Sequence, residues 1–152
     1  MSRAAYVAVL VAALSFDSRL HAEKVDLTPA QLLETATHVM TGKVKAIFSR
    51  VEVNEDYEYR HYVAEVAVEG IEKGKGLKKT QLVYVRYLTM GYVGDGLPRL
   101  GSSGHRGLPA VGETLRIYLE LNGDDGGYDV VFANGFETIQ KAKTVPGKAR
   151  KK

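Results

Sequence analysis

Apolar and polar residues alternate at every second position through much of this chain of 152 residues. A two-residue period places the apolar side chains on one face of a β-strand, so the pattern predicts half-buried strands. The alternation is clearest where Leu115, Ile117, Leu119 and Leu121 are separated by more polar residues. We expect five strands, within residues 43–49, 61–69, 81–88, 115–121 and 128–132.

Glycine-rich turns separate two of the expected strand pairs. Gly74-Lys75-Gly76 lies between the second and third strands, and residues 122–127 lie between the fourth and fifth. Both stretches have the composition of tight turns. Because a sheet that closes on itself leaves no exposed edge, five short strands favour a small barrel. The fold class is therefore expected to be all-β (mainly β), as a five-stranded closed barrel.

One short helix is expected before the strands. Thr28 is a suitable N-cap, Pro29 fits the first helical position, and Gln31 completes a capping box. Leu32 and Ala36 then recur at helical spacing. We expect this N-terminal helix to lie against the barrel as a lid.

The order of these segments resembles a known family. The segments that carry the resemblance are Val39-Met40-Thr41-Gly42-Lys43-Val44, Tyr62-Val63-Ala64-Glu65-Val66 followed by Glu72-Lys73-Gly74, Gln81-Leu82-Val83-Tyr84-Val85, and Val111-Gly112-Glu113-Thr114-Leu115-Arg116-Ile117-Tyr118-Leu119. Over residues 35–136 the chain is similar to bacterial secreted domains of the netrin and tissue-inhibitor-of-metalloproteinases type. The resemblance implies a five-stranded OB-like barrel and an extracellular binding habit. The metalloproteinase inhibitors of that superfamily bind the zinc of their target through an N-terminal cysteine, and this chain has no cysteine, so that mechanism is not expected.

The first 22 residues resemble a secretory signal peptide. Arg3 gives a positive start, residues 4–14 are uncharged and largely apolar, and Ala22 offers a small residue for cleavage. The apolar run is shorter than the roughly 20 residues that cross a bilayer, so no transmembrane segment is expected after cleavage. The alternative is a helix packed on the domain. We expect a secreted or periplasmic protein with a barrel domain in residues 23–140 and a basic, disordered tail in residues 141–152.

The charge is unevenly distributed. The formal net charge is +3, but the last twelve residues hold six basic residues and no acid, so residues 23–140 carry a net charge of −4. A nucleic-acid-binding domain usually presents a basic surface, so a nucleic-acid partner is not expected. The basic tail is either solvated chain or a contact for an anionic surface.

A long glycine-rich segment is the candidate ligand-binding site. Residues 91–109 are expected to lack regular structure, and such long loops in compact domains are usually either functional or disordered. Asp95, Arg99, His105 and Arg106 supply charge and an imidazole. The alternative is a flexible excursion between two strands.

Two tyrosines complete the expected binding site, because Tyr57 and Tyr59 lie in an acidic hairpin where exposed rings can stack on a ligand. Residues for catalysis are sparse. Ser102 and Ser103 lie near His105 without a motif that would activate a nucleophile, and the histidines have no metal-ligand spacing. We therefore expect no cofactor or metal, and a non-catalytic module for a protein or glycan ligand. The alternative is a hydrolase or metal-dependent enzyme organised around His105.

Overall fold

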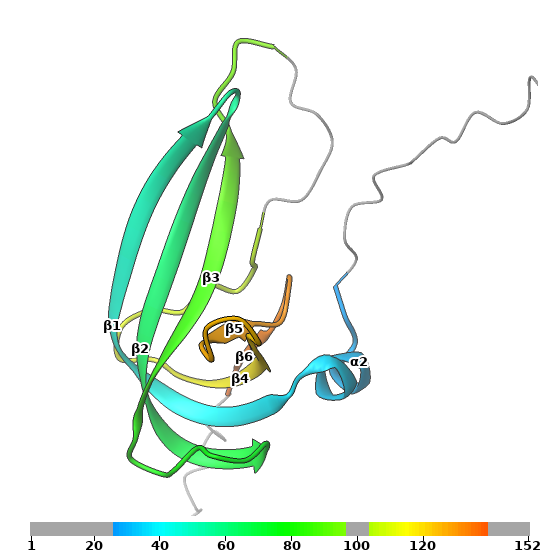
Figure 1. Cartoon of the computed structure of the whole chain (residues 1–152), viewed down its shortest axis with the longest axis vertical. Coiled ribbons are helices and arrows are strands. Elements are labelled where there is room, and N and C mark those ends of the chain that lie inside the picture. Colours follow the sequence, from blue (N-terminus) through cyan, green and yellow to red (C-terminus); the bar gives the residue numbers. More distant parts are fainter. Residues whose placement is uncertain (1–25, 97–103, 140–152) are drawn as a thin grey trace, which may run out of the picture.

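A computed structural model describes residues 26–96 and 104–139. These residues form one short helix and one six-stranded sheet, so the fold is mainly β (Figure 1). The elements in chain order are α2 (Pro29–Thr35), β1 (His38–Asn54), β2 (Tyr57–Lys73), β3 (Leu82–Tyr92), β4 (Thr114–Leu121), β5 (Tyr128–Val130) and β6 (Phe136–Thr138).

The strands are ordered β1-β2-β3-β5-β4-β6, and β4 also pairs with the first six residues of β1. Hydrogen-bonded pairing therefore leads from β1 through β2, β3, β5 and β4 back to β1. All pairs are antiparallel except β3 with β5. The expectation of five strands is wrong by one, because β6 pairs with β4 as a sixth. With only three residues, β6 is too short to produce a recognisable alternation.

β1 and β2 are much longer than the alternation predicts, with 17 residues each. They are joined by a two-residue turn at Glu55 and Asp56, and beyond the part that pairs with β4 they rise with β3 as a long three-stranded extension (Figure 1). Irregularities in pairing along the lower part of β1 accompany its curved path. One of them involves Gly42, where a Cβ would come within 2.4 Å of the Val66 side chain.

The main core is formed by the inward-facing apolar residues of all six strands. Its members include Met40, Val44, Ala64, Val66, Val68, Val83, Val85, Leu115, Ile117, Leu119, Val130 and Phe136. Most of them occupy alternate positions of the expected strands, so the period-two pattern is confirmed as the source of the core.

The helix begins where the sequence predicts. The backbone N–H of Gln31 donates to the Thr28 hydroxyl at 3.3 Å, and the Thr28 N–H donates to the Gln31 side chain at 2.9 Å, which confirms the capping box. Leu32 and Ala36 pack with Val39, Tyr118 and Val131 in a second apolar cluster. The helix therefore lies against β1 and β4 rather than covering the main core.

Both glycine turns have the expected backbone. Gly74 and Gly76 have φ of +99° and +90°, and Gly126 has φ of +70°. These left-handed values favour glycine, which confirms the two turns. The expected signal peptide, the basic tail and Arg99 lie outside the described residues. No helix within residues 26–96 and 104–139 is long and apolar enough to cross a membrane.

Candidate functional site

A pocket of about 400 Å³ lies where β2 and β3 meet β4, β5 and the segment 104–106. Its walls are mainly apolar, with charged side chains among them. The lining residues are His61, Tyr62, Val63, Arg86, Tyr87, Leu88, His105, Glu120, Asp129, Val130 and Phe132. A concave, largely apolar site with a few polar groups is the usual form of a small binding site.

Aromatic rings form much of the apolar wall. Tyr62 and Tyr87, opposite each other on β2 and β3, stack with ring centroids 4.8 Å apart and nearly parallel planes. Tyr87 also meets Phe136 edge to face at 5.1 Å, and His105 meets Phe132 in the same way at 5.0 Å. Burial, together with the neighbouring Tyr62, raises the pKa of Tyr87 to about 12. Tyr87 is therefore neutral, and the rings of this wall are well packed.

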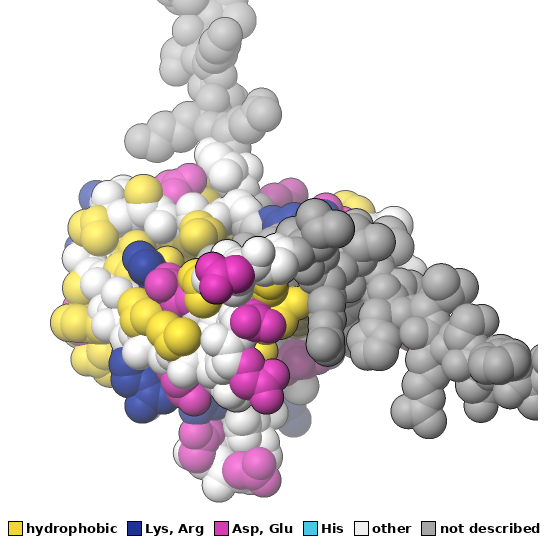
Figure 2. Space-filling view, turned by 90° about the horizontal axis from the view of Figure 1, so that it is seen from above, with side chains coloured by type: hydrophobic (Ala, Val, Ile, Leu, Met, Phe, Trp, Pro, Cys, Tyr) yellow, Lys and Arg dark blue, Asp and Glu magenta, His cyan; other side chains and the backbone are white. Residues whose placement is uncertain are grey.

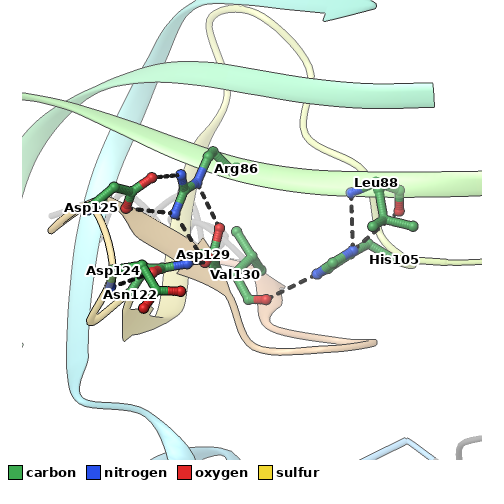
Figure 3. A network of polar contacts seen from close by, with 9 residues as sticks. Arg86, Leu88, His105, Asn122, Asp124, Asp125, Asp129 and Val130 are labelled. Atoms are coloured by element: carbon green, nitrogen blue, oxygen red, sulfur yellow. Dashed lines mark hydrogen bonds and ion pairs between the residues drawn. The ribbon is translucent and has the colours of Figure 1, made fainter. Parts of the chain in front are cut away.

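Arg86 anchors the polar wall (Figure 3). Its guanidinium donates to both carboxylate oxygens of Asp129, at 2.7 and 3.0 Å, and also to Asp125. Asn122 donates to the same Asp129 carboxylate at 2.9 Å. The hydrogen bonds that Arg86 donates to Asp125 and Asp129 raise the pKa of Arg86, and the bond from Arg86 lowers the pKa of Asp125. Arg86 thus remains positively charged, but two carboxylates share its charge.

His105 is buried and binds backbone groups of two strands (Figure 3). Its Nε2 lies 2.9 Å from the carbonyl oxygen of Val130, which only accepts, so Nε2 carries a hydrogen. The backbone N–H of Leu88 lies 3.2 Å from Nδ1, and the backbone N–H of His105 donates to the Leu88 carbonyl at 2.8 Å. His105 therefore fastens the end of the glycine-rich segment to β3 and β5.

Gly104 makes this attachment possible. It has φ of +88°, and a Cβ there would come within 2.6 Å of both the Leu88 carbonyl oxygen and the Thr89 Cα. Only glycine permits such close approach of two backbones in this conformation. Gly104 and His105, near the end of the expected loop, therefore have a fixed position beside β3. Gly104 pairs with Thr89 of that strand.

The other expected site residues lie elsewhere. Arg106 is half-buried, with its guanidinium 3.1 Å from Asp26, and Asp95 is exposed near the tip of β3. Tyr57 packs edge to face on Tyr92 at 5.4 Å and, like Tyr59, is half-buried.

Neither Tyr57 nor Tyr59 lines the pocket that contains His105. Tyr57 is opposite Tyr92, whereas His105 contacts Leu88, four positions earlier in β3. At about 3.3 Å per residue these points are roughly 13 Å apart. Among the described tyrosines the most exposed is Tyr84, at 54%, so the expectation that Tyr57 and Tyr59 would be the exposed rings is wrong.

Of the residues that line the pocket, His105 alone was predicted from the sequence as a site residue. One signal was available, because Arg86 is the only charged residue within residues 81–92. Its partner Asp129 could not be identified, because it meets Arg86 through the parallel pairing of β3 with β5, strands that are far apart in the sequence.

No group of three or more histidine, aspartate or glutamate side chains within the described residues could hold a metal ion. Comparison of the chain with protein-family models, with curated proteins and with solved structures gives no match.

Proposed function

We propose that this protein is an exported, non-catalytic binding module for a protein ligand. One apolar side chain of the ligand occupies the pocket. The observation that carries the proposal is the pocket itself, with its wall of Tyr62, Tyr87 and Phe132 beside the Arg86–Asp129 pair. An apolar pocket with a few oriented polar groups fits one side chain of a partner better than an extended polar chain.

The charges around the pocket favour a basic group next to that apolar side chain. Arg86 is matched by Asp125 and Asp129, and the exposed Glu120 adds a further carboxylate to the lining. Carboxylates therefore outnumber the single guanidinium here. Complementary charge guides and orients a partner, so a lysine or arginine neighbouring the apolar residue is expected in the ligand.

The bonding of His105 supports binding rather than catalysis. A general base needs a ring nitrogen within reach of the proton it removes. Within the described residues, the hydrogen-bond partners of the His105 ring are backbone groups of Leu88 and Val130. A hydrolase or metal-dependent enzyme built on His105 would have to release at least one of these bonds.

We also propose that the strands close into an OB-like barrel, and the return of the pairing from β4 to β1 supports this architecture. The strand 2–3 face and the loop between strands 4 and 5 are where OB barrels commonly bind ligands. The pocket has residues of β2 and β3 in its wall, and Asp125 of that loop bonds to Arg86. The resemblance to the netrin and metalloproteinase-inhibitor domains remains a prediction.

A nucleic-acid ligand is disfavoured by the acidic body of the chain. Seen from above, hydrophobic and acidic side chains lie among the basic ones, without a continuous basic field on that face (Figure 2). Phosphate contacts supply most of the affinity for nucleic acid and require such a field.

Export rests on the signal-like pattern of residues 1–22. Expression of the whole chain in a bacterium with a secretory pathway should give an extracytoplasmic product that begins at Glu23, identified by mass spectrometry of the intact protein. A cytoplasmic product that retains Met1 would contradict export.

The binding proposal is tested with peptide and saccharide arrays probed with residues 23–152. We expect capture by peptides that join an apolar residue to lysine or arginine. Val63→Trp, which enlarges a side chain of the pocket lining, should abolish capture, whereas Val93→Trp, at an exposed position outside the pocket lining, should not. Capture by saccharides alone, or equal capture by Val63→Trp, would contradict the proposal.

A further inference from the structure

Within the described residues, the outer edge of β1 is unpaired over part of its length and lies outside the pocket lining. Pairing of β1 with β4 ends at Lys43, and the last backbone bonds on that side join Val44 to Gly112 and Glu113. From Ala46 to Asn54, β1 pairs with β2 on its other side, and no described segment pairs with its outer edge. A strand edge of this length is a template for another strand.

The register fixes which backbone groups face outward. Asn54 and Tyr57 flank the two-residue turn and so form a hydrogen-bonded pair, and bonding then recurs at every second residue of β1. In β2 the odd-numbered residues from Tyr57 therefore bond to β1 and the even-numbered ones face β3. The bond from the Val68 N–H to Gln81, on the β3 side of β2, agrees with this alternation. The outward N–H and C=O groups therefore belong to Ser49, Val51 and Val53.

The charged side chains along this edge are complementary to those of a second, antiparallel copy of the same strand. Val51 and Val53 are exposed, at 47% and 63%, on one face of the strand. Arg50 and Glu52 lie on the opposite face with side chains 76% and 56% exposed. The two charges flank Val51 symmetrically and have opposite sign.

We propose that two copies of this chain pair through their β1 edges, antiparallel, about a two-fold axis at Val51. The Val51 residues then exchange both backbone hydrogen bonds, and Ser49 of each copy lies opposite Val53 of the other. Arg50 of each copy lies opposite Glu52 of the other. These are non-hydrogen-bonded pairs, in which the Cα atoms are only about 4.5 Å apart and the side chains are close.

The charges select this register from its neighbours. An axis at Arg50 also keeps the backbone bonding, with Val51 opposite Ser49, but it would oppose two arginines and place Glu52 opposite Phe48. An axis at Ser49 keeps the backbone bonding but places Arg50 opposite Phe48 and Glu52 opposite Ala46. Only the axis at Val51 pairs both charges with their opposites, twice per dimer.

Sedimentation velocity at rising protein concentration tests the proposal with charge variants of the residue 23–152 chain. The wild type should pass from monomer to dimer. Arg50→Glu opposes two glutamates and Glu52→Arg opposes two arginines, so each should raise the dimer dissociation constant about tenfold or more. An equimolar mixture of these two variants should form a heterodimer, and the double variant Arg50→Glu/Glu52→Arg should restore the homodimer.

Val51→Pro gives an independent check, because proline removes an outward N–H and is tolerated on edge strands. It should abolish dimerisation while the circular dichroism spectrum stays that of the wild type. A wild type that remains monomeric at every concentration would overturn the proposal. Dimers of either single charge variant as tight as those of the wild type, or a mixture that stays monomeric, would overturn it as well.

Discussion

At the scale of single residues, the pocket depends on one glycine and one histidine. Gly104 allows the chain to approach β3 closely, and His105 then binds the backbone of both β3 and β5. The sequence singled out His105 as an imidazole in a glycine-rich loop. Its observed bonds give it a positioning role, because they hold a wall of the pocket in place.

Substitution of Gly104 should therefore destabilise the fold. In Gly104→Ala the new Cβ meets two backbone atoms at 2.6 Å in a left-handed conformation, so we expect a loss of about 1–3 kcal/mol in the free energy of unfolding. Gly123→Ala is the matched control, because its Cβ would meet nothing within 4 Å. Urea denaturation measures both variants. Equal stability of the two would contradict the close approach of Gly104 to β3.

The buried Tyr87 makes the free energy of unfolding depend on pH. Its pKa is about 12 in the folded protein and about 10 in the unfolded chain. The folded protein thus holds the phenolic proton more tightly than the unfolded chain. The resulting contribution to stability is complete below about pH 10 and is lost as the pH rises towards about 12. The loss amounts to roughly 3 kcal/mol in the free energy of unfolding. Urea denaturation across this pH range should show a smaller decline in the free energy of unfolding for Tyr87→Phe than for the wild type. An equal decline would contradict the raised pKa of Tyr87.

At the scale of elements, the sequence predicted what is local. Alternation located the five main strands, and the capping box located the start of α2. The ends of β1 and β2 next to the turn, residues 50–54 and 57–60, were missed, because Val51 and Val53 are exposed there and the charged residues around the turn resemble a loop. The pocket was missed for a different reason. It depends on the pairing of β3 with β5, a long-range contact that no local pattern encodes.

The helix cap gives a prediction at this scale. Thr28→Ala removes the hydroxyl that accepts the Gln31 N–H, so the free energy of unfolding should fall by about 1 kcal/mol. Thr35→Ala, at the exposed end of the same helix, is the control and should be neutral or slightly stabilising. Thermal denaturation would separate the two. A Thr28→Ala variant as stable as Thr35→Ala would show that the cap does not stabilise α2.

At the scale of the whole molecule, the pocket and the β1 edge use different parts of the same sheet. The pocket is lined by residues 61–63 of β2 and 86–88 of β3, whereas the proposed dimer contact uses the outer edge of β1. A dimer formed through β1 would carry two pockets related by the two-fold axis. A partner with two basic, apolar segments would then bind more tightly than one with a single segment.

A nuclear magnetic resonance titration would show whether the ligand binds in the pocket. Isotope-labelled residues 23–152 would be titrated with the peptide that the array captures best. We predict amide shift changes concentrated at residues 61–63, 86–88, 104–106 and 129–132, and their loss in Val63→Trp. Changes confined to α2 or to the tip of the β1–β2 hairpin, or the same changes in Val63→Trp, would contradict binding in the pocket.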